Sequence, residues 1–153
     1  METDRGIWIT RLDDLLCEVI SSKEAYSKLS LTEDIPLKRQ FFKEQAEQRL
    51  DFEQILSDEI IAVKEGGVFK RKKEGACIFD NVAEKVNSTG LTSIEVDRLI
   101  LQREQDLIRK YQEVLNYENI PDATNAILQS QAEDINDIAQ KLILELNLEE
   151  NNF

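Results

Sequence analysis

The sequence predicts an all-α protein, a four-helix bundle made of two antiparallel helical hairpins joined by a long crossover. Three observations lead to this expectation. Helix-forming residues dominate, while the 153 residues include only five Gly and two Pro. Four long segments repeat their apolar residues with the period of an α-helix. Two of the three connections between these segments are short and the third is long.

The first two helices are expected at residues 9–29 and 36–64. The apolar face of the first consists of Leu12, Leu15, Leu16, Val19 and Tyr26. The apolar face of the second consists of Leu37, Phe41, Phe52, Ile55, Leu56 and Val63. Pro36 suits a first helical turn, where its missing N–H is harmless. Gly66 and Gly67 then suit the end of the second helix.

The other two helices are expected at residues 93–117 and 121–148. The third helix has its apolar face at Ile100, Leu107, Ile108, Tyr111, Val114 and Leu115. The fourth has Ile127, Leu128, Ile135, Ile138, Leu142 and Leu146. Thr92 and Glu95 have the spacing of a capping box, in which each side chain binds a free backbone N–H. Pro121 suits the start of the fourth helix.

The lengths of the connections predict the topology. About six residues separate the first pair of helices and about three the second pair, so each pair forms an antiparallel hairpin. About 28 residues, 65–92, join the hairpins, enough to run the length of a bundle. They include a short amphipathic piece at 77–86, so we expect the crossover to contain a short helix. We expect residues 1–153 to form a single domain.

The charge balance excludes some classes of partner. With 31 acidic and 19 basic residues, the net charge is −12, which repels nucleic acids and anionic membranes. The basic run 70–73 is flanked by Glu65 and Glu74 and is interpreted as a solvated loop. No apolar run approaches the length of a membrane span, and no signal peptide is visible. We therefore expect a cytoplasmic protein.

Residues from three of the expected helices form a pattern known from one protein family. They are Phe41, Phe42, Gln48 and Phe52, then Glu104, Ile108 and Tyr111, then Pro121, Ile127, Leu128 and Gln131. The piece of the crossover at 75–90 also has the expected length and place. By this pattern the chain resembles, over residues 9–148, a bacterial branch of the ferritin-like superfamily without assigned function.

The resemblance implies a place where iron chemistry would occur in other members of the superfamily. Ferritin-like iron enzymes project a carboxylate inward from each helix, together with Glu-x-x-His pairs. Members of this branch often have Glu where this chain has Gln48, and His near the position of Ala139. This chain has no histidine at all. It therefore departs from the iron-binding pattern, and we expect neither a metal nor another cofactor.

Several polar residues are expected on the inward faces of the helices. They are Lys23, Gln45, Gln48, Glu59, Glu104 and Gln131. Our interpretation is a structural layer in which amides, Glu104 and Lys23 satisfy one another. A metal or small-molecule site and a solvent-filled gap remain as alternatives. Glu18, Glu24 and Glu47 are expected on the flanks.

No residues are assigned to catalysis. Without histidine there is no Ser-His or Cys-His dyad, and no Gly-rich phosphate loop is present. Cys17 and Cys77 lie sixty residues apart, and a disulfide between them stays open. The expected function is a non-catalytic binding or structural module. The alternatives are a carboxylate-only di-metal protein with oxidase or storage activity, and an acidic inhibitor that binds a protein partner.

Self-association is also expected, through an apolar face of the crossover. Phe69, Ile78, Phe79 and Val82 are more apolar than a short connecting helix needs for docking. For Phe69, Phe79 and Trp8 themselves, our main interpretation is packing of the crossover and the N-terminus against the bundle, and an exposed patch is the other. The expected partners are thus a second copy of the chain or another protein.

Overall fold

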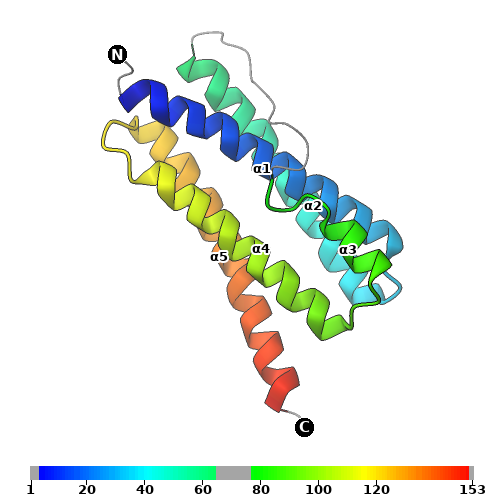
Figure 1. Ribbon diagram of the computed structural model, residues 1–153. Coiled ribbons are helices and arrows are strands. Elements are labelled where there is room, and N and C mark those ends of the chain that lie inside the picture. Colours follow the sequence, from blue (N-terminus) through cyan, green and yellow to red (C-terminus); the bar gives the residue numbers. More distant parts are fainter. Residues whose placement is uncertain (1–3, 65–76, 152–153) are drawn as a thin grey trace.

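The computed structural model consists of five helices, and it describes residues 4–64 and 77–151 (Figure 1). They are α1 (Asp4–Thr32), α2 (Pro36–Val63), α3 (Val82–Ser88), α4 (Ser93–Leu115) and α5 (Asp122–Asn151). The helices α1 and α2 pack along each other as one hairpin, and α4 and α5 form the second. The predicted all-α arrangement of two long hairpins is confirmed. In these residues, no helix is long and apolar enough to cross a membrane.

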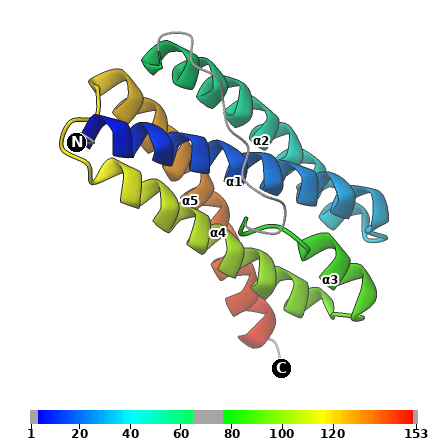
Figure 2. The same cartoon turned by 45° about the horizontal axis from the view of Figure 1, so that its top comes forward.

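The two hairpins meet through α1 with α4 and through α2 with α5. Figure 2 shows α1 between α2 and α4, with α3 lying against the end of α1 that leads into α2. The C-terminal end of α5 extends beyond the other helices in both views (Figures 1 and 2), while Ile138 and Leu142 still belong to the core. Because the hairpins pack against each other, the four long helices surround one interior, where polar residues near their middles lie.

The helix ends follow the local signals in the sequence. Pro36 occupies the first turn of α2. Thr92 accepts a hydrogen bond from the Glu95 N–H, while the Glu95 side chain accepts one from the Thr92 N–H, so the predicted capping box is confirmed. Pro121 directly precedes α5, and its carbonyl accepts a hydrogen bond of 2.9 Å from the Asn125 N–H. Gly66 and Gly67 lie outside the described residues.

The core contains the predicted faces of α1, α4 and α5, whereas the predicted face of α2 is confirmed only in part. Phe52 and Leu56 are buried as expected. Leu37 is 84% exposed and Ile55 is 38% exposed, although both were expected inside. The buried residues of α2 are Phe42, Gln45, Arg49, Phe52, Leu56 and Ile60. The buried stripe of α2 therefore overlaps the predicted one at Phe52 and Leu56 and extends to one side of it. It includes a full arginine side chain.

The crossover residues pack inward, contrary to the predicted self-association face. The short helix expected in the crossover is confirmed as α3, although it begins later than the amphipathic piece at 77–86, after a turn. Phe79 and Val82 are buried in the core, and Ile78 is half-buried. The Phe79 ring lies 5.5 Å from the ring of Tyr26 in α1. Phe69 and the basic run 70–73 lie outside the described residues.

Two further expectations concern Trp8 and the cysteines. Trp8 is buried in the core of the described bundle. The expectation that it packs against the bundle is therefore confirmed. Cys17 is buried and Cys77 half-buried, and no disulfide joins them.

Candidate functional site

The centre of the bundle holds a buried ion pair between Arg49 of α2 and Glu104 of α4. Both side chains are 0% exposed. Arg49 Nη1 donates to Glu104 Oε1 at 2.9 Å, and Arg49 Nη2 donates to Glu104 Oε2. Two parallel N–H···O bonds of this kind fix the orientation of both groups as well as their distance. The prediction that an inward amide or Lys23 is the partner of Glu104 is wrong, because the partner is Arg49.

The helical period places both residues on core faces. Arg49 follows Gln45 by one turn and precedes Phe52 by another, inside the buried stripe of α2. Glu104 lies between Ile100 and Leu107 on the buried stripe of α4, as predicted. The sequence analysis missed Arg49, because arginine is seldom fully buried. Its spacing from Phe42 and Phe52 was the signal that could have revealed it.

Tyr26 of α1 forms one wall of the ion pair. The guanidinium carbon of Arg49 lies 5.4 Å from the centre of the Tyr26 ring, within the range of a cation–π contact. Burial raises the pKa of the Tyr26 hydroxyl well above its usual value, and the negative charge of Glu104 adds to this effect. Among the described residues, the hydroxyl makes no hydrogen bond of good geometry. Tyr26 therefore stays neutral beside the pair.

Tyr111 and Gln131 extend the polar layer from α4 through α5 to α2. The Tyr111 hydroxyl donates to Gln131 Oε1 at 2.6 Å. Gln131 Nε2 donates in turn to the backbone carbonyl of Phe52 at 3.4 Å. Burial raises the pKa of Tyr111, which favours its neutral, hydrogen-donating form. Each of the four long helices thus contributes to one interior layer.

The charges of this layer cancel locally. Burial alone would lower the pKa of Arg49, but the adjacent Glu104 carboxylate outweighs burial and the pKa is raised. Arg49 is therefore a fixed cation next to a carboxylate whose two oxygens both accept from it. The two charged groups are directed at each other, and neither side chain reaches solvent. A buried pair of this kind can hold two helices in one register.

Two of the predicted inward residues lie at the edge of the bundle. Lys23 pairs with Glu53 across the α1–α2 interface at 2.5 Å, and both side chains are about a quarter exposed. Glu59 accepts a hydrogen bond of 2.5 Å from the hydroxyl of Thr124, which joins α2 to α5. Neither residue belongs to the central layer.

The two predicted amides of α2 flank the ion pair. Gln48 is half-buried and accepts a long hydrogen bond of 3.4 Å from Arg49 Nε. Gln45 is buried, and its side-chain oxygen has no partner among the described residues. Of the amides expected inside, only Gln131 forms a short hydrogen bond within the layer.

Glu18 was expected on a flank of α1, but its side chain is buried. It accepts a hydrogen bond of 2.8 Å from the backbone N–H of Ile78. Asp80 assists by accepting from Ser21 at 2.6 Å and from the Cys77 N–H at 2.9 Å. These carboxylates fasten the turn before α3 to α1. The prediction for Glu18 failed because a backbone group of the crossover, the N–H of Ile78, binds it.

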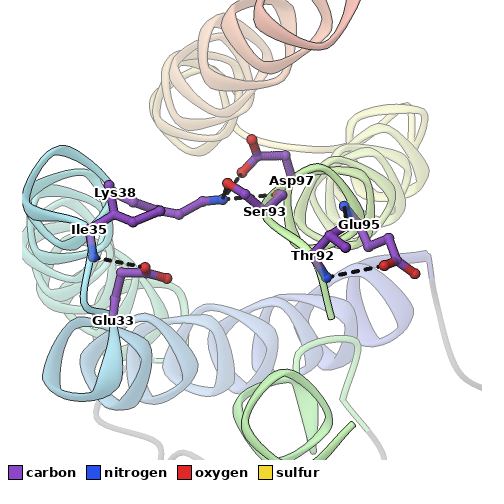
Figure 3. A network of polar contacts seen from close by, with 7 residues as sticks. All are labelled: Glu33, Ile35, Lys38, Thr92, Ser93, Glu95 and Asp97. Carbon is purple, nitrogen blue, oxygen red and sulfur yellow. Dashed lines mark hydrogen bonds and ion pairs between the residues drawn. The ribbon is translucent and has the colours of Figure 1, made fainter. Parts of the chain in front are cut away.

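A second polar network joins the start of α2 to the start of α4. Lys38 extends from α2 to Asp97, with an ion pair of 3.1 Å, and to the carbonyl of Ser93 at 2.9 Å (Figure 3). The Lys38 and Asp97 side chains are each only about a tenth exposed. This network lies at the end of the bundle that holds the α1–α2 turn (Figures 1 and 3).

No protein-family model matches the chain, and searches of curated proteins and of solved structures find no significant match. Within the described parts of the chain, no three cysteine or acidic side chains are grouped so that they could hold a metal ion.

Proposed function

We propose that the chain is a non-catalytic ferritin-like bundle that acts as a binding or structural module through its outer surface. The ion pair between Arg49 and Glu104 carries this proposal. In a ferritin-like iron enzyme, the middle of the bundle is lined with carboxylates. Here the corresponding space contains an arginine whose hydrogen bonds to Glu104 are already complete.

Electrostatics argue against a metal at the same place. A divalent cation bound by Glu104 would lie within a few ångströms of the Arg49 guanidinium, where the repulsion is strong in a buried environment. Displacing Arg49 would leave a charged group buried without a partner. The carboxylate-only di-metal alternative therefore needs a rearrangement of α2 that a structural layer does not need.

Metal content tests this proposal directly. The protein would be produced with iron or manganese supplementation and analysed for metal after gel filtration. We expect well below one metal ion per chain. A content near two ions per chain that disappears in Glu104→Gln would overturn the proposal, provided that the exposed control variant Glu47→Gln retains the metal.

The outer face of α2 supports a second candidate, an acidic protein that binds and inhibits a basic partner. Its outward ridge carries Glu44, Glu47, Asp51 and Asp58, all exposed. Leu50 and Ile61 are exposed next to this ridge. Anionic and apolar groups on one helix face complement a basic amphipathic segment.

Charge reversal on this ridge tests the second candidate. A basic partner retained at low salt should be released at high salt, because the attraction is screened. Asp51→Lys with Asp58→Lys should abolish retention. Glu133→Lys with Asp134→Lys, on exposed positions of α5, should not. Equal losses in both variants would show attraction to net charge alone and would refute a site on α2.

A further inference from the structure

The two most exposed large apolar side chains of the described residues lie on either side of the α1–α2 turn. Leu31 is 85% exposed, Leu37 is 84% exposed, and Ile35 between them is 48% exposed. This turn forms the right-hand end of the molecule in Figure 1, next to α3. Single exposed leucines are common on proteins, but three within seven residues form an apolar tip. We refer to Leu31, Ile35 and Leu37 as the tip.

An open hollow lies beside the tip. It has a volume of about 440 Å³ and lies between the end of α1 and α3. Leu31 and Ala83 supply apolar walls, while Thr32 and Asn87 border it with polar groups. A protruding apolar group next to a hollow suits a two-fold symmetric contact, because the group of each copy can enter the hollow of the other.

The tip is held in shape by hydrogen bonds on both sides of the turn. Glu33 accepts from the backbone N–H of Ile35 at 3.1 Å (Figure 3). Thr32 donates to the side-chain oxygen of Asn87 at 3.1 Å, which ties the turn to α3. Lys38 ties the first turn of α2 to Ser93 and Asp97 of α4 (Figure 3). A surface that is already ordered loses little conformational entropy when a partner binds.

Charge distinguishes this end from the rest of the molecule. Residues 28–43 contain four cations and two anions, and α3 contains one of each. Residues 93–98, the start of α4, add one cation and two anions. Six cations and five anions give this end a net charge of +1, against −12 for the whole chain. Two copies can therefore approach here without the repulsion that the rest of their surfaces would produce.

We propose that the protein self-associates end to end through the tip, with a second copy of the same chain as the occupant. The leucines of one copy bury themselves against the tip and the hollow of the other, around a two-fold axis. A basic partner is disfavoured at this place because the tip is not acidic. The inference gives the proposed binding module its partner and surface. It does not depend on whether the interior binds metal, so the two proposals fail in different experiments.

Sedimentation equilibrium of matched double variants tests the tip. The wild-type chain should show a reversible dimer at concentrations up to about 1 mM. Leu31→Ser with Leu37→Ser should raise the dimer dissociation constant at least about tenfold, because both copies in the dimer lose these two leucines. The control is Leu144→Ser with Leu148→Ser in α5, where both leucines are also mostly exposed. It should leave the constant within about twofold.

Three outcomes would overturn the proposal. The wild-type chain could remain monomeric over this range, the tip variant could dimerise as well as the wild type, or only the α5 variant could lose the dimer. Circular dichroism and a urea midpoint close to wild type would establish that each variant is folded. These substitutions remove exposed side chains, so we expect little effect on the fold.

The charge balance of the tip gives a separate test. Arg39→Glu with Lys43→Glu makes this end of the molecule acidic and should abolish the dimer at low salt. Added salt should restore it, because screening removes the new repulsion. The same change of −4 in net charge, made by Gln129→Glu, Gln140→Glu and Lys141→Glu on exposed positions of α5, should have a much smaller effect. Equal weakening by both variants would contradict a contact through the tip.

Discussion

Arg49 and Glu104 differ from the other described ion pairs because neither side chain reaches solvent. The energy of such a pair depends on both members being present. The attraction between them offsets the desolvation of two charges, and removing one leaves the other without compensation. The pair thus contributes more to the choice of a single helix arrangement than to net stability.

Removing only the charge of Glu104 should therefore be costly. We expect Glu104→Gln to lower the free energy of unfolding by about 3–5 kcal/mol, because Arg49 stays buried and charged. Urea unfolding followed by circular dichroism measures this. The matched control is Glu53→Gln, whose partner Lys23 is partly solvated, with an expected loss below about 1 kcal/mol.

Replacing both members should have a different result. Arg49→Met with Glu104→Leu removes the buried charges together and should leave stability unchanged or raise it by about 1–4 kcal/mol. A double variant as unstable as Glu104→Gln would mean that shape, rather than charge, makes this site essential.

The contribution of Tyr111 to the stability of the fold should depend on pH. Burial raises its pKa, so the folded protein holds this proton at a pH where the unfolded chain, with a pKa near 10, releases it. The stabilisation is complete below about pH 10 and is lost as pH rises toward the folded pKa. The loss per tyrosine is at most about 1.4 kcal/mol per pH unit. Urea midpoints should therefore decline as the pH rises from about 10 to about 12, and less steeply in Tyr111→Phe.

The same variant also has an expected effect at neutral pH. Tyr111→Phe leaves the Gln131 oxygen without its donor, at a cost of about 1–3 kcal/mol. An alkaline decline as steep as in the wild type would mean that other groups dominate it.

Sequence reasoning could place Glu104 and Gln131 inside, because each continues an apolar stripe with the period of a helix. It could not identify Arg49 as the partner. A buried arginine is recognised only when the opposite charge is known to face it, and that depends on how two distant helices pack. Glu18 was misplaced for the same reason, since its partner is a backbone group of the crossover.

At the scale of the elements, the helix starts were predictable because their signals are local. The start of α2 depends on Pro36, and that of α4 on Thr92 with Glu95. The buried face of α2 was harder, since apolar residues occur on two sides of this helix. Leu37 and Ile55 suggested one stripe, whereas Phe42 and Ile60 belong to the stripe that packs. Tertiary contacts with α1 decide between them.

The capping box gives a prediction at this scale. Thr92→Ala removes the acceptor for the Glu95 N–H and should destabilise the protein by about 0.5–2 kcal/mol. Ser130→Ala, at an exposed position inside α5, should have no effect or a slightly stabilising one, since Ala favours helices. Thermal unfolding of both variants distinguishes a cap from a general effect of losing a hydroxyl. Equal shifts would show that the cap contributes nothing of its own.

At the scale of the whole molecule, connection lengths predicted the two hairpins, because short loops force antiparallel neighbours. The prediction that the apolar residues of the crossover are exposed was wrong, because Phe79 and Val82 belong to the core. The acidic charge is also unevenly distributed. It lies on outward faces such as the ridge of α2, while the α1–α2 end is nearly balanced.

This distribution predicts how stability responds to salt. The compact state brings an excess of twelve negative charges together, and the resulting self-repulsion is screened by added ions. Raising NaCl from low to moderate concentration should therefore increase the free energy of unfolding by about 1 kcal/mol, or about 2–4 °C in Tm. Asp51→Asn with Asp58→Asn should give part of this gain at low salt and reduce the response to salt. These measurements should be made in the variant Leu31→Ser with Leu37→Ser, which we expect to dimerise less, because salt also promotes association. A melting temperature that falls with salt would mean that exposed ion pairs such as Lys28 with Glu84 outweigh the repulsion.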